Sequence, residues 1–117
     1  MNRVIFDIDG VLLWQGYPTP LLKVAKELCL ADTEVVLVSG REERERLKTI
    51  NQLGGLWGYS LYLAGDKFAK MVWLASEGVQ TIFENDPVMV QKLWAAGLPC
   101  TPINSDLYRR GSWPRPT

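Results

Sequence analysis

Two aspartates, Asp7 and Asp9, follow an apolar run near the start of the chain, and Gly10 comes directly after them. A carboxylate buried at the end of an apolar strand costs free energy unless a cation or hydrogen-bond donors compensate for its charge. Paired carboxylates are typical ligands of a hard divalent cation, and they also serve as nucleophiles and as general acids and bases. This spacing therefore predicts a catalytic or metal-binding site at the end of a strand.

Three further groups of polar residues follow later in the chain. They are Ser39-Gly40-Arg41, the lysines Lys67 and Lys70, and the cluster Glu84-Asn85-Asp86. Carboxylates are ligands of a hard cation, whereas a hydroxyl, backbone amides and a lysine bind an anion. If the fold brings these groups together, the combination indicates a magnesium ion and a phosphate.

Alternating apolar runs and amphipathic stretches must position these groups. We expect strands at 3–8, 34–38, 60–63, 79–83 and 98–103, and helices at 20–30, 42–53, 66–77 and 87–96. This alternation predicts an α/β fold, a Rossmann-like three-layer sandwich with a central parallel sheet of about five strands. Ligands of such sheets bind at the carboxyl ends of the strands, which is where most of the polar groups fall.

Length and composition limit the possible functions. The chain has 117 residues, which suffices for one domain, expected at 1–105, and proline spacing predicts an extended or disordered tail at 106–117. The net charge is zero, so any site for a polyanion must be local. Histidine is absent, which excludes histidine triads, histidine metal ligands and histidine phosphotransfer.

The expected setting is a reducing cytoplasm without membrane contact. Cys29 and Cys100 lie far apart and lack the spacing of a metal site. No apolar run is long enough to span a bilayer.

The order DIDGVL, VLVSGR, a lysine and an acidic cluster resembles the four motifs of haloacid-dehalogenase-type phosphohydrolases, over about residues 4–97. The resemblance implies a Mg²⁺-dependent phosphatase that works through an aspartyl-phosphate. The segments 11–19 and 54–65 are too short to fold as the cap domains of this family. We therefore expect a capless member with an open site.

The resemblance also implies a role for each motif residue. Asp7 would be the nucleophile and a magnesium ligand. Asp9 would act as general acid and base and bind the metal through its carbonyl. Ser39 and the Gly40 amide would hold phosphoryl oxygens, while Arg41 and Gly10 are further candidates for substrate binding.

Two assignments involve a choice. Lys67 and Lys70 both qualify as the lysine between nucleophile and phosphate, and Lys70 is favoured because it lies one turn into the helix that Asp66 caps. Asp86 would complete the metal shell, although the family has an acidic pair or Gly-Asp where this chain has Glu84-Asn85-Asp86. If Asn85 faces the cation instead, the metal would bind more weakly.

A narrower resemblance concerns the substrate. VLVSGRE, the spacing from Asp66 to Lys70 with Trp73 after it, and Asn85-Asp86 followed by Val90 and Trp94 are similar to the 3′-phosphatase domain of phage-type polynucleotide kinases. The kinase-type GxxxxGK[ST] loop is absent from the sequence. This likeness implies a nucleic acid 3′ end or a nucleotide as the phosphorylated substrate.

Three alternatives stay open. One is a small-metabolite phosphatase roofed over by oligomerisation, and another is a degenerate, non-catalytic binding module, suggested by Asn85. The third is a phospho-acceptor signalling domain. It is disfavoured because Ala64-Gly65, where the acceptor aspartate would stand, follows the third expected strand.

Overall fold

Five parallel strands form the central sheet of the computed structural model, which describes residues 2–106. They are β1 (Arg3–Asp7), β4 (Glu34–Ser39), β5 (Ser60–Leu63), β6 (Thr81–Glu84) and β7 (Cys100–Pro102). Their order across the sheet is β5-β4-β1-β6-β7, so the first strand of the chain lies in the middle. Parallel pairing brings the carboxyl ends of β4, β1 and β6 to the same edge of the sheet.

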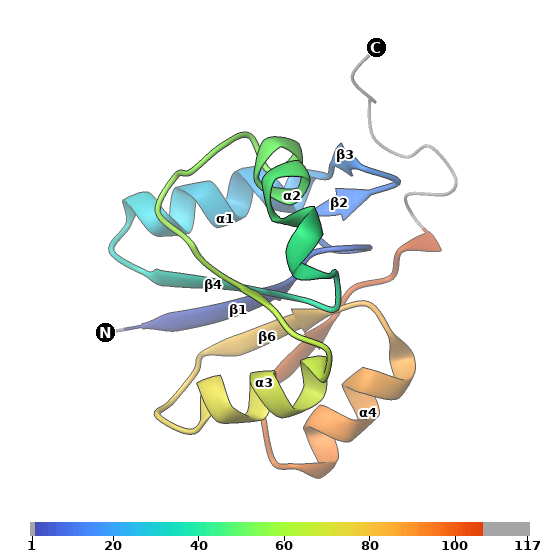
Figure 1. The fold of residues 1–117 in the computed structure, drawn as a ribbon. Helices are drawn as coiled ribbons and strands as arrows, with labels where there is room; N and C mark the ends of the chain where they lie inside the picture. Colours follow the sequence, from blue (N-terminus) through green and yellow to red (C-terminus); the bar gives the residue numbers. More distant parts are fainter. Residues whose placement is uncertain (1, 107–117) are drawn as a thin grey trace.

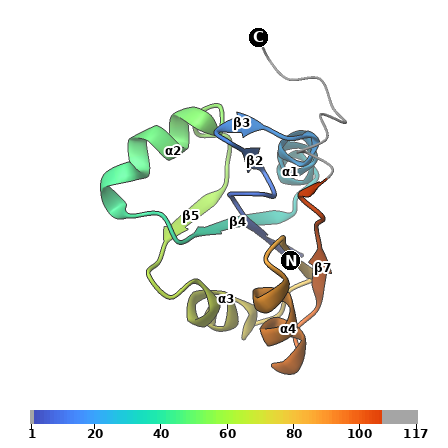
Figure 2. The ribbon, with the colours of Figure 1, turned by 90° about the vertical axis from the view of Figure 1, so that its right-hand side faces the viewer.

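Helices cover both faces of this sheet (Figure 1 and Figure 2). The first pair, α1 (Pro20–Leu30) and α2 (Arg46–Gln52), lies on one side, and α3 (Lys67–Ala75) and α4 (Pro87–Ala95) lie on the other. The chain passes through helical segments between successive parallel strands, as in β-α-β units. The predicted α/β, Rossmann-like three-layer sandwich is confirmed.

The core is divided between the two faces because side chains alternate along each strand. Phe6 of β1 is buried in one cluster with Leu22 of α1, whereas Ile5 is buried in the other with Met71 and Leu93. Both faces of β1 are thus removed from water, which explains its uninterrupted apolar run. Asp7 ends that run at a position that is only 3% exposed.

The helix predicted at 42–53 is confirmed only in its later part. This segment begins with a 3₁₀ turn, η1 (Glu43–Glu45), and α2 follows it. The backbone N–H of Glu42 donates to Glu45 Oε2 at 3.0 Å, which satisfies a donor at the start of the turn.

The segment between β1 and α1, to which the sequence analysis assigned no strand or helix, forms a short hairpin. Its strands are β2 (Leu13–Trp14) and β3 (Tyr17–Pro18), joined by Gln15 and Gly16 with φ angles of 51° and 82°. Positive φ at both turn positions is typical of the type I′ turn, whose twist matches that of paired strands. With strands of two residues each, the hairpin is too small to be a cap domain.

The predicted domain boundary coincides with the end of the described residues. All but the first residue of the predicted tail, 106–117, fall outside them, so the division into 1–105 and 106–117 stays a prediction. None of the helices in residues 2–106 has the length and apolar character needed to cross a lipid bilayer.

Candidate active site

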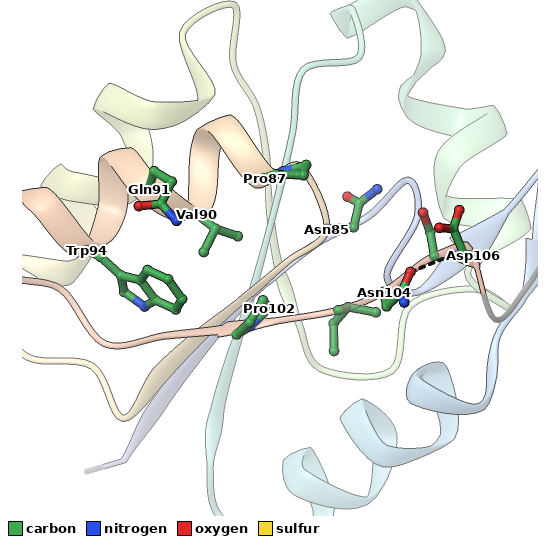
Figure 3. A pocket seen from close by; sticks show the side chains of 10 residues that line it. Asn85, Pro87, Val90, Gln91, Trp94, Pro102, Asn104 and Asp106 are labelled. Carbon is green, nitrogen blue, oxygen red and sulfur yellow. Dashed lines mark hydrogen bonds between the residues drawn. The ribbon is translucent and has the colours of Figure 1, made fainter.

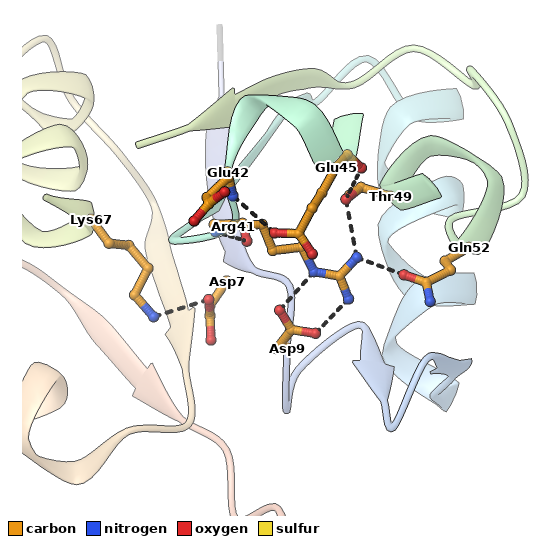
Figure 4. Close-up of polar contacts among 9 residues, drawn as sticks. Asp7, Asp9, Arg41, Glu42, Glu45, Thr49, Gln52 and Lys67 are labelled. Carbon is orange, nitrogen blue, oxygen red and sulfur yellow. Dashed lines mark hydrogen bonds and ion pairs between the residues drawn. The ribbon is translucent and has the colours of Figure 1, made fainter. Parts of the chain in front are cut away.

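The carboxylate of Asp7 lies at the centre of the site, at the end of the middle strand. Lys67, the first residue of α3, donates from Nζ to Asp7 Oδ1 at 3.0 Å (Figure 4). The same Nζ lies 2.9 Å from Glu84 Oε1. One ammonium therefore faces two carboxylates, at the carboxyl ends of β1 and β6.

Burial dominates the electrostatics of this cluster. Desolvation raises the pKa of Asp7 well above its usual value, and repulsion from Glu84 raises it further, against the attraction of Lys67. Burial would lower the pKa of Lys67, but its attraction to Asp7 and Glu84 outweighs burial and raises that pKa. When both acids are ionised, the cluster keeps one negative charge that a bound cation would offset.

Glu84 is a buried acid to which the sequence analysis gave no role. Its Oε2 accepts hydrogen bonds from the backbone N–H groups of Asn85 and Asp86, at 2.9 and 3.0 Å. Its Oε1 faces Lys67 without a well-directed hydrogen bond. The same signal that singled out Asp7 was available here, because Glu84 also ends an apolar strand and is fully buried. Glu84 thus holds Lys67 beside Asp7.

The side-chain amide of Asn85 lies against three oxygens of the site. One of its two terminal atoms is 2.8 Å from Asp7 Oδ2, 3.0 Å from the Asp9 carbonyl oxygen and 3.1 Å from Glu84 Oε2. With its nitrogen oriented toward these oxygens, the amide donates to all three. Asn85 is therefore the residue of the acidic cluster that faces Asp7 and Asp9.

Gly10 makes this position of Asn85 possible. Its φ is +86°, in the region that glycine adopts without strain. A Cβ at this position would collide with the side-chain amide of Asn85, at 2.5 Å from its Cγ. The structure thus gives Gly10, a predicted substrate-binding residue, a packing role beneath Asn85.

Substitution of Gly10 by alanine is expected to destabilise the protein by about 1–3 kcal/mol, because the new side chain is strained and displaces Asn85. Gly65→Ala is the matched control, since a Cβ there has no atom within 4 Å and needs no positive φ. Urea unfolding monitored by tryptophan fluorescence measures both variants. Equal midpoints for the two would contradict the packing role.

The guanidinium of Arg41 binds both carboxylate oxygens of Asp9. Nε donates to Oδ2 at 2.9 Å and Nη2 donates to Oδ1 at 2.7 Å (Figure 4). From the other side, Nη1 donates to Thr49 Oγ1 at 3.0 Å and to Gln52 Oε1 at 2.6 Å. The hydrogen bonds that Arg41 donates to Asp9 raise the pKa of Arg41. Arg41 was predicted to bind substrate, but in this structure its donors are directed at Asp9 and α2.

Ser39 and Gly40 lie where the sequence analysis placed them, at the end of β4 and next to β1. Asp7 pairs with Val38, so Ser39 follows directly beside the carboxyl end of β1. The backbone N–H of Arg41 donates to Ser39 Oγ at 3.0 Å. This bond uses Ser39 as an acceptor and leaves its O–H available as a donor.

Lys67, and not the favoured Lys70, contacts the acids in this structure. The ammonium of Lys70 lies 4.8 Å from the ring centroid of Trp73 and 5.4 Å from that of Tyr62. Helices between parallel strands run back from the carboxyl edge of the sheet. Three residues of helix therefore place Lys70 about 4.5 Å farther from that edge than Lys67.

Asp86, which was expected to complete a metal shell, instead lies at the start of α4. Its Oδ1 accepts a hydrogen bond from the backbone N–H of Val88 at 3.0 Å and so caps α4. Within residues 2–106, no group of three or more Asp, Glu, Cys or His side chains is placed to hold a metal ion. Near Asp7, carboxylate oxygens and the backbone carbonyl of Asp9 converge on the side-chain nitrogen of Asn85.

A groove of about 570 Å³ begins at Asn85 and continues along α4 to Trp94 (Figure 3). Val90 and Pro102 contribute apolar surface, and Asp106 is the one charged residue among the described residues that line it. The lining therefore offers no cation for a chain of phosphates and suits an uncharged group.

Comparison with known proteins bears on the fold. No family model matches the chain, and no curated protein matches it either. Among solved structures, it is similar to a chain of the Pnkp1/Rnl/Hen1 complex, with a TM-score of 0.63 and 22% identity over 87% of this chain and 45% of the other. It is also similar to the hypothetical protein XCC2798 from Xanthomonas campestris, with a TM-score of 0.56 and 22% identity over 84% of this chain and 62% of the other.

This chain spans less than two thirds of the length of either neighbour. At these identities the likeness concerns the fold alone. The comparison therefore supports the α/β fold with a central five-stranded parallel sheet.

Proposed function

We propose that this chain is a Mg²⁺-dependent phosphomonoester hydrolase in which Asp7 becomes transiently phosphorylated. The observation that carries the proposal is the buried Asp7 carboxylate at the end of the central strand, held between Lys67 and Asn85. Burial of two acids beside one ammonium is costly for stability and needs a functional reason.

The residues around Asp7 fit a magnesium ion. Asp7 Oδ2, the Asp9 carbonyl and the amide of Asn85 supply hard oxygen donors, provided that the amide turns its oxygen toward the ion. The residual negative charge of the cluster favours a cation in the same place. The bound ion would offset the charge that builds up between the carboxylate and a phosphoryl group. Asn85 replaces the predicted Asp86 in this set.

The chemistry follows from the positions of the two aspartates. An oxygen of Asp7 attacks phosphorus and the bond from phosphorus to the ester oxygen breaks. Asp9, in its protonated form and with one oxygen released from Arg41, gives its proton to the leaving oxygen. Asp9 then takes a proton from water, which attacks the phosphoryl group and regenerates Asp7. The Asp9 side chain is 57% exposed, so water reaches it.

Charge and orientation come from the neighbouring residues. Lys67, rather than Lys70, offsets charge between Asp7 and the phosphoryl oxygens. The Ser39 hydroxyl and the Gly40 amide donate hydrogen bonds to those oxygens. Glu84 holds the ammonium of Lys67 in place.

For the substrate, we propose a phosphate on a nucleic acid 3′ end or on a nucleotide. Support comes from the motif resemblance to polynucleotide 3′-phosphatases, from the fold likeness to a chain of the Pnkp1/Rnl/Hen1 complex, and from the absence of a cap within residues 2–106. The groove beside Asn85, lined by one carboxylate and by no cation among the described residues, provides room for the nucleoside that bears the phosphate but not for a longer chain of phosphates. A cytoplasmic location is part of the same proposal.

A second candidate is a non-catalytic binding module. Asn85 favours it, because an amide nitrogen that donates to Asp7 occupies the side on which a cation would bind. The two candidates differ in turnover, which one assay measures.

The assay is phosphate release with Mg²⁺ or with EDTA from 3′-phosphorylated oligonucleotides, nucleoside monophosphates and sugar phosphates. We expect release from the oligonucleotide with Mg²⁺ and none with EDTA, because the acids need the cation to accept a phosphate. Release from sugar phosphates alone would contradict the nucleic acid substrate and favour a small-metabolite phosphatase. Binding of phosphate without any release would favour the binding module.

A further inference from the structure

We infer that Gln52 is a positioning residue for Asp9, acting through Arg41 and held in place by the turn of the β2–β3 hairpin. The inference rests on the proposed function, since it concerns the general acid of that reaction. It names a residue to which no motif pointed.

The direction of the Asp9 carboxyl group decides whether Asp9 can donate a proton. A general acid works only when its carboxyl group is within hydrogen-bond reach of the leaving oxygen. The Asp9 side chain is largely exposed, so burial does not fix its direction. The contact with Arg41 does, because one planar guanidinium binds both oxygens of the carboxylate and still binds one of them when the other carries the proton.

Arg41 is itself held by hydrogen bonds to two side chains of α2. Its side chain is 13% exposed, and its remaining guanidinium nitrogen, Nη1, is bound from behind by α2. Gln52 Oε1 accepts at 2.6 Å and Thr49 Oγ1 at 3.0 Å. Thr49 in turn donates to the Glu45 carbonyl at 2.9 Å, so the helix backbone anchors the arrangement.

The amide of Gln52 has a defined orientation, because its oxygen accepts from Arg41. Its Nε2 packs against the hairpin turn, where a Cβ on Gly16 would lie 2.9 Å from it. The nitrogen therefore faces the hairpin and the oxygen faces Arg41. The hairpin is tied to the Asp9 loop as well, since the Gly10 N–H donates to the Leu13 carbonyl at 2.7 Å. Gln52 thus lies between Arg41 and the turn of the hairpin.

The experiment separates proton donation from all other effects of a substitution. An alkyl phosphate needs a proton on its leaving oxygen, whereas 4-nitrophenolate leaves without one. The value of kcat/KM includes formation of the phosphorylated enzyme but not its hydrolysis. We compare kcat/KM for a 3′-phosphorylated oligonucleotide and for 4-nitrophenyl phosphate.

Gln52→Met keeps the length of the side chain and removes the acceptor. It is expected to lower kcat/KM about 10–100-fold on the oligonucleotide, part of the contribution of a general acid, and less than about threefold on 4-nitrophenyl phosphate. Gln52→Glu keeps an acceptor for Arg41 and should restore most of the loss. Asn51→Met, the same change on the exposed neighbour, should leave both values unchanged.

An equal loss on both substrates, or no loss on either, would overturn the inference. A wild-type protein that releases no phosphate would instead refute the proposed function. In that case a double-mutant cycle of urea midpoints for Gln52→Met and Asp9→Asn decides the positioning claim. Non-additive shifts support it, and additive shifts refute it.

Discussion

Asp7→Asn is expected to reduce phosphate release by about 10⁴–10⁶-fold on every substrate that the wild-type protein hydrolyses, which is the scale of loss when a covalent nucleophile is removed. An amide has nearly the same shape as the carboxylate but does not attack phosphorus. Initial rates of phosphate release at saturating Mg²⁺ measure the effect.

The same variant should not lose stability in the absence of divalent cations. Because burial and Glu84 raise the pKa of Asp7 above its unfolded value, the ionised carboxylate lowers stability as the pH rises through that range. Asparagine removes this charge, so the urea midpoint at neutral pH should be no lower than that of the wild type. Loss of activity would then not be a consequence of unfolding.

Asp32→Asn serves as the matched control for this prediction. Asp32 is exposed, and its φ of 65° suits asparagine as well as aspartate. Activity should be unchanged in this control. Asp7→Asn with activity near that of the wild type would show that another group attacks phosphorus.

Lys67→Met is expected to cost both activity and stability, whereas Lys70→Met should cost little of either. Removal of Lys67 leaves Asp7 and Glu84 buried without their shared cation, and breaking a buried pair from one side costs about 3–5 kcal/mol. Lys70 contacts two aromatic rings, one of them on the exposed Trp73, for which a loss of about 0.5–1 kcal/mol is expected. Urea unfolding and phosphate release measure both variants.

Magnesium provides a second test of the Lys67 variant. If the ion binds beside Asp7, it should recover part of the lost stability, because it compensates for the same two carboxylates. A larger loss of activity in Lys70→Met than in Lys67→Met would contradict the placement of Lys67.

The sequence predicted the fold well because the evidence for it is local. Apolar runs such as the one before Asp7 and the helix starts at Pro20 and Pro87 lie where the structure has elements. Parallel order then follows from the alternation of strands and helices. The strand-end argument brought Asp7 and Ser39 to one edge without knowledge of any contact.

The placement of Lys67, Asn85 and Gln52 depends on where each side chain points in the fold, and the local sequence does not encode this. Lys67 and Lys70 differ only in their distance from the sheet edge, which requires the path of α3. Asn85 and Asp86 are neighbours, and the turn into α4 decides that Asp86 caps the helix while Asn85 faces Asp7. Gln52 carries no motif, because an amide late in a helix is usually a solvated side chain.

The most direct test of the account is the location of the phosphoryl group during turnover. The protein is mixed with Mg²⁺ and substrate, quenched in acid and reduced with borohydride, which converts an aspartyl-phosphate into homoserine. Fragmentation of the tryptic peptide between Arg3 and Lys23 distinguishes Asp7 from Asp9. The account predicts conversion at Asp7 and none in Asp7→Asn. Phosphate release with no conversion at Asp7, or with conversion at another residue, would contradict it.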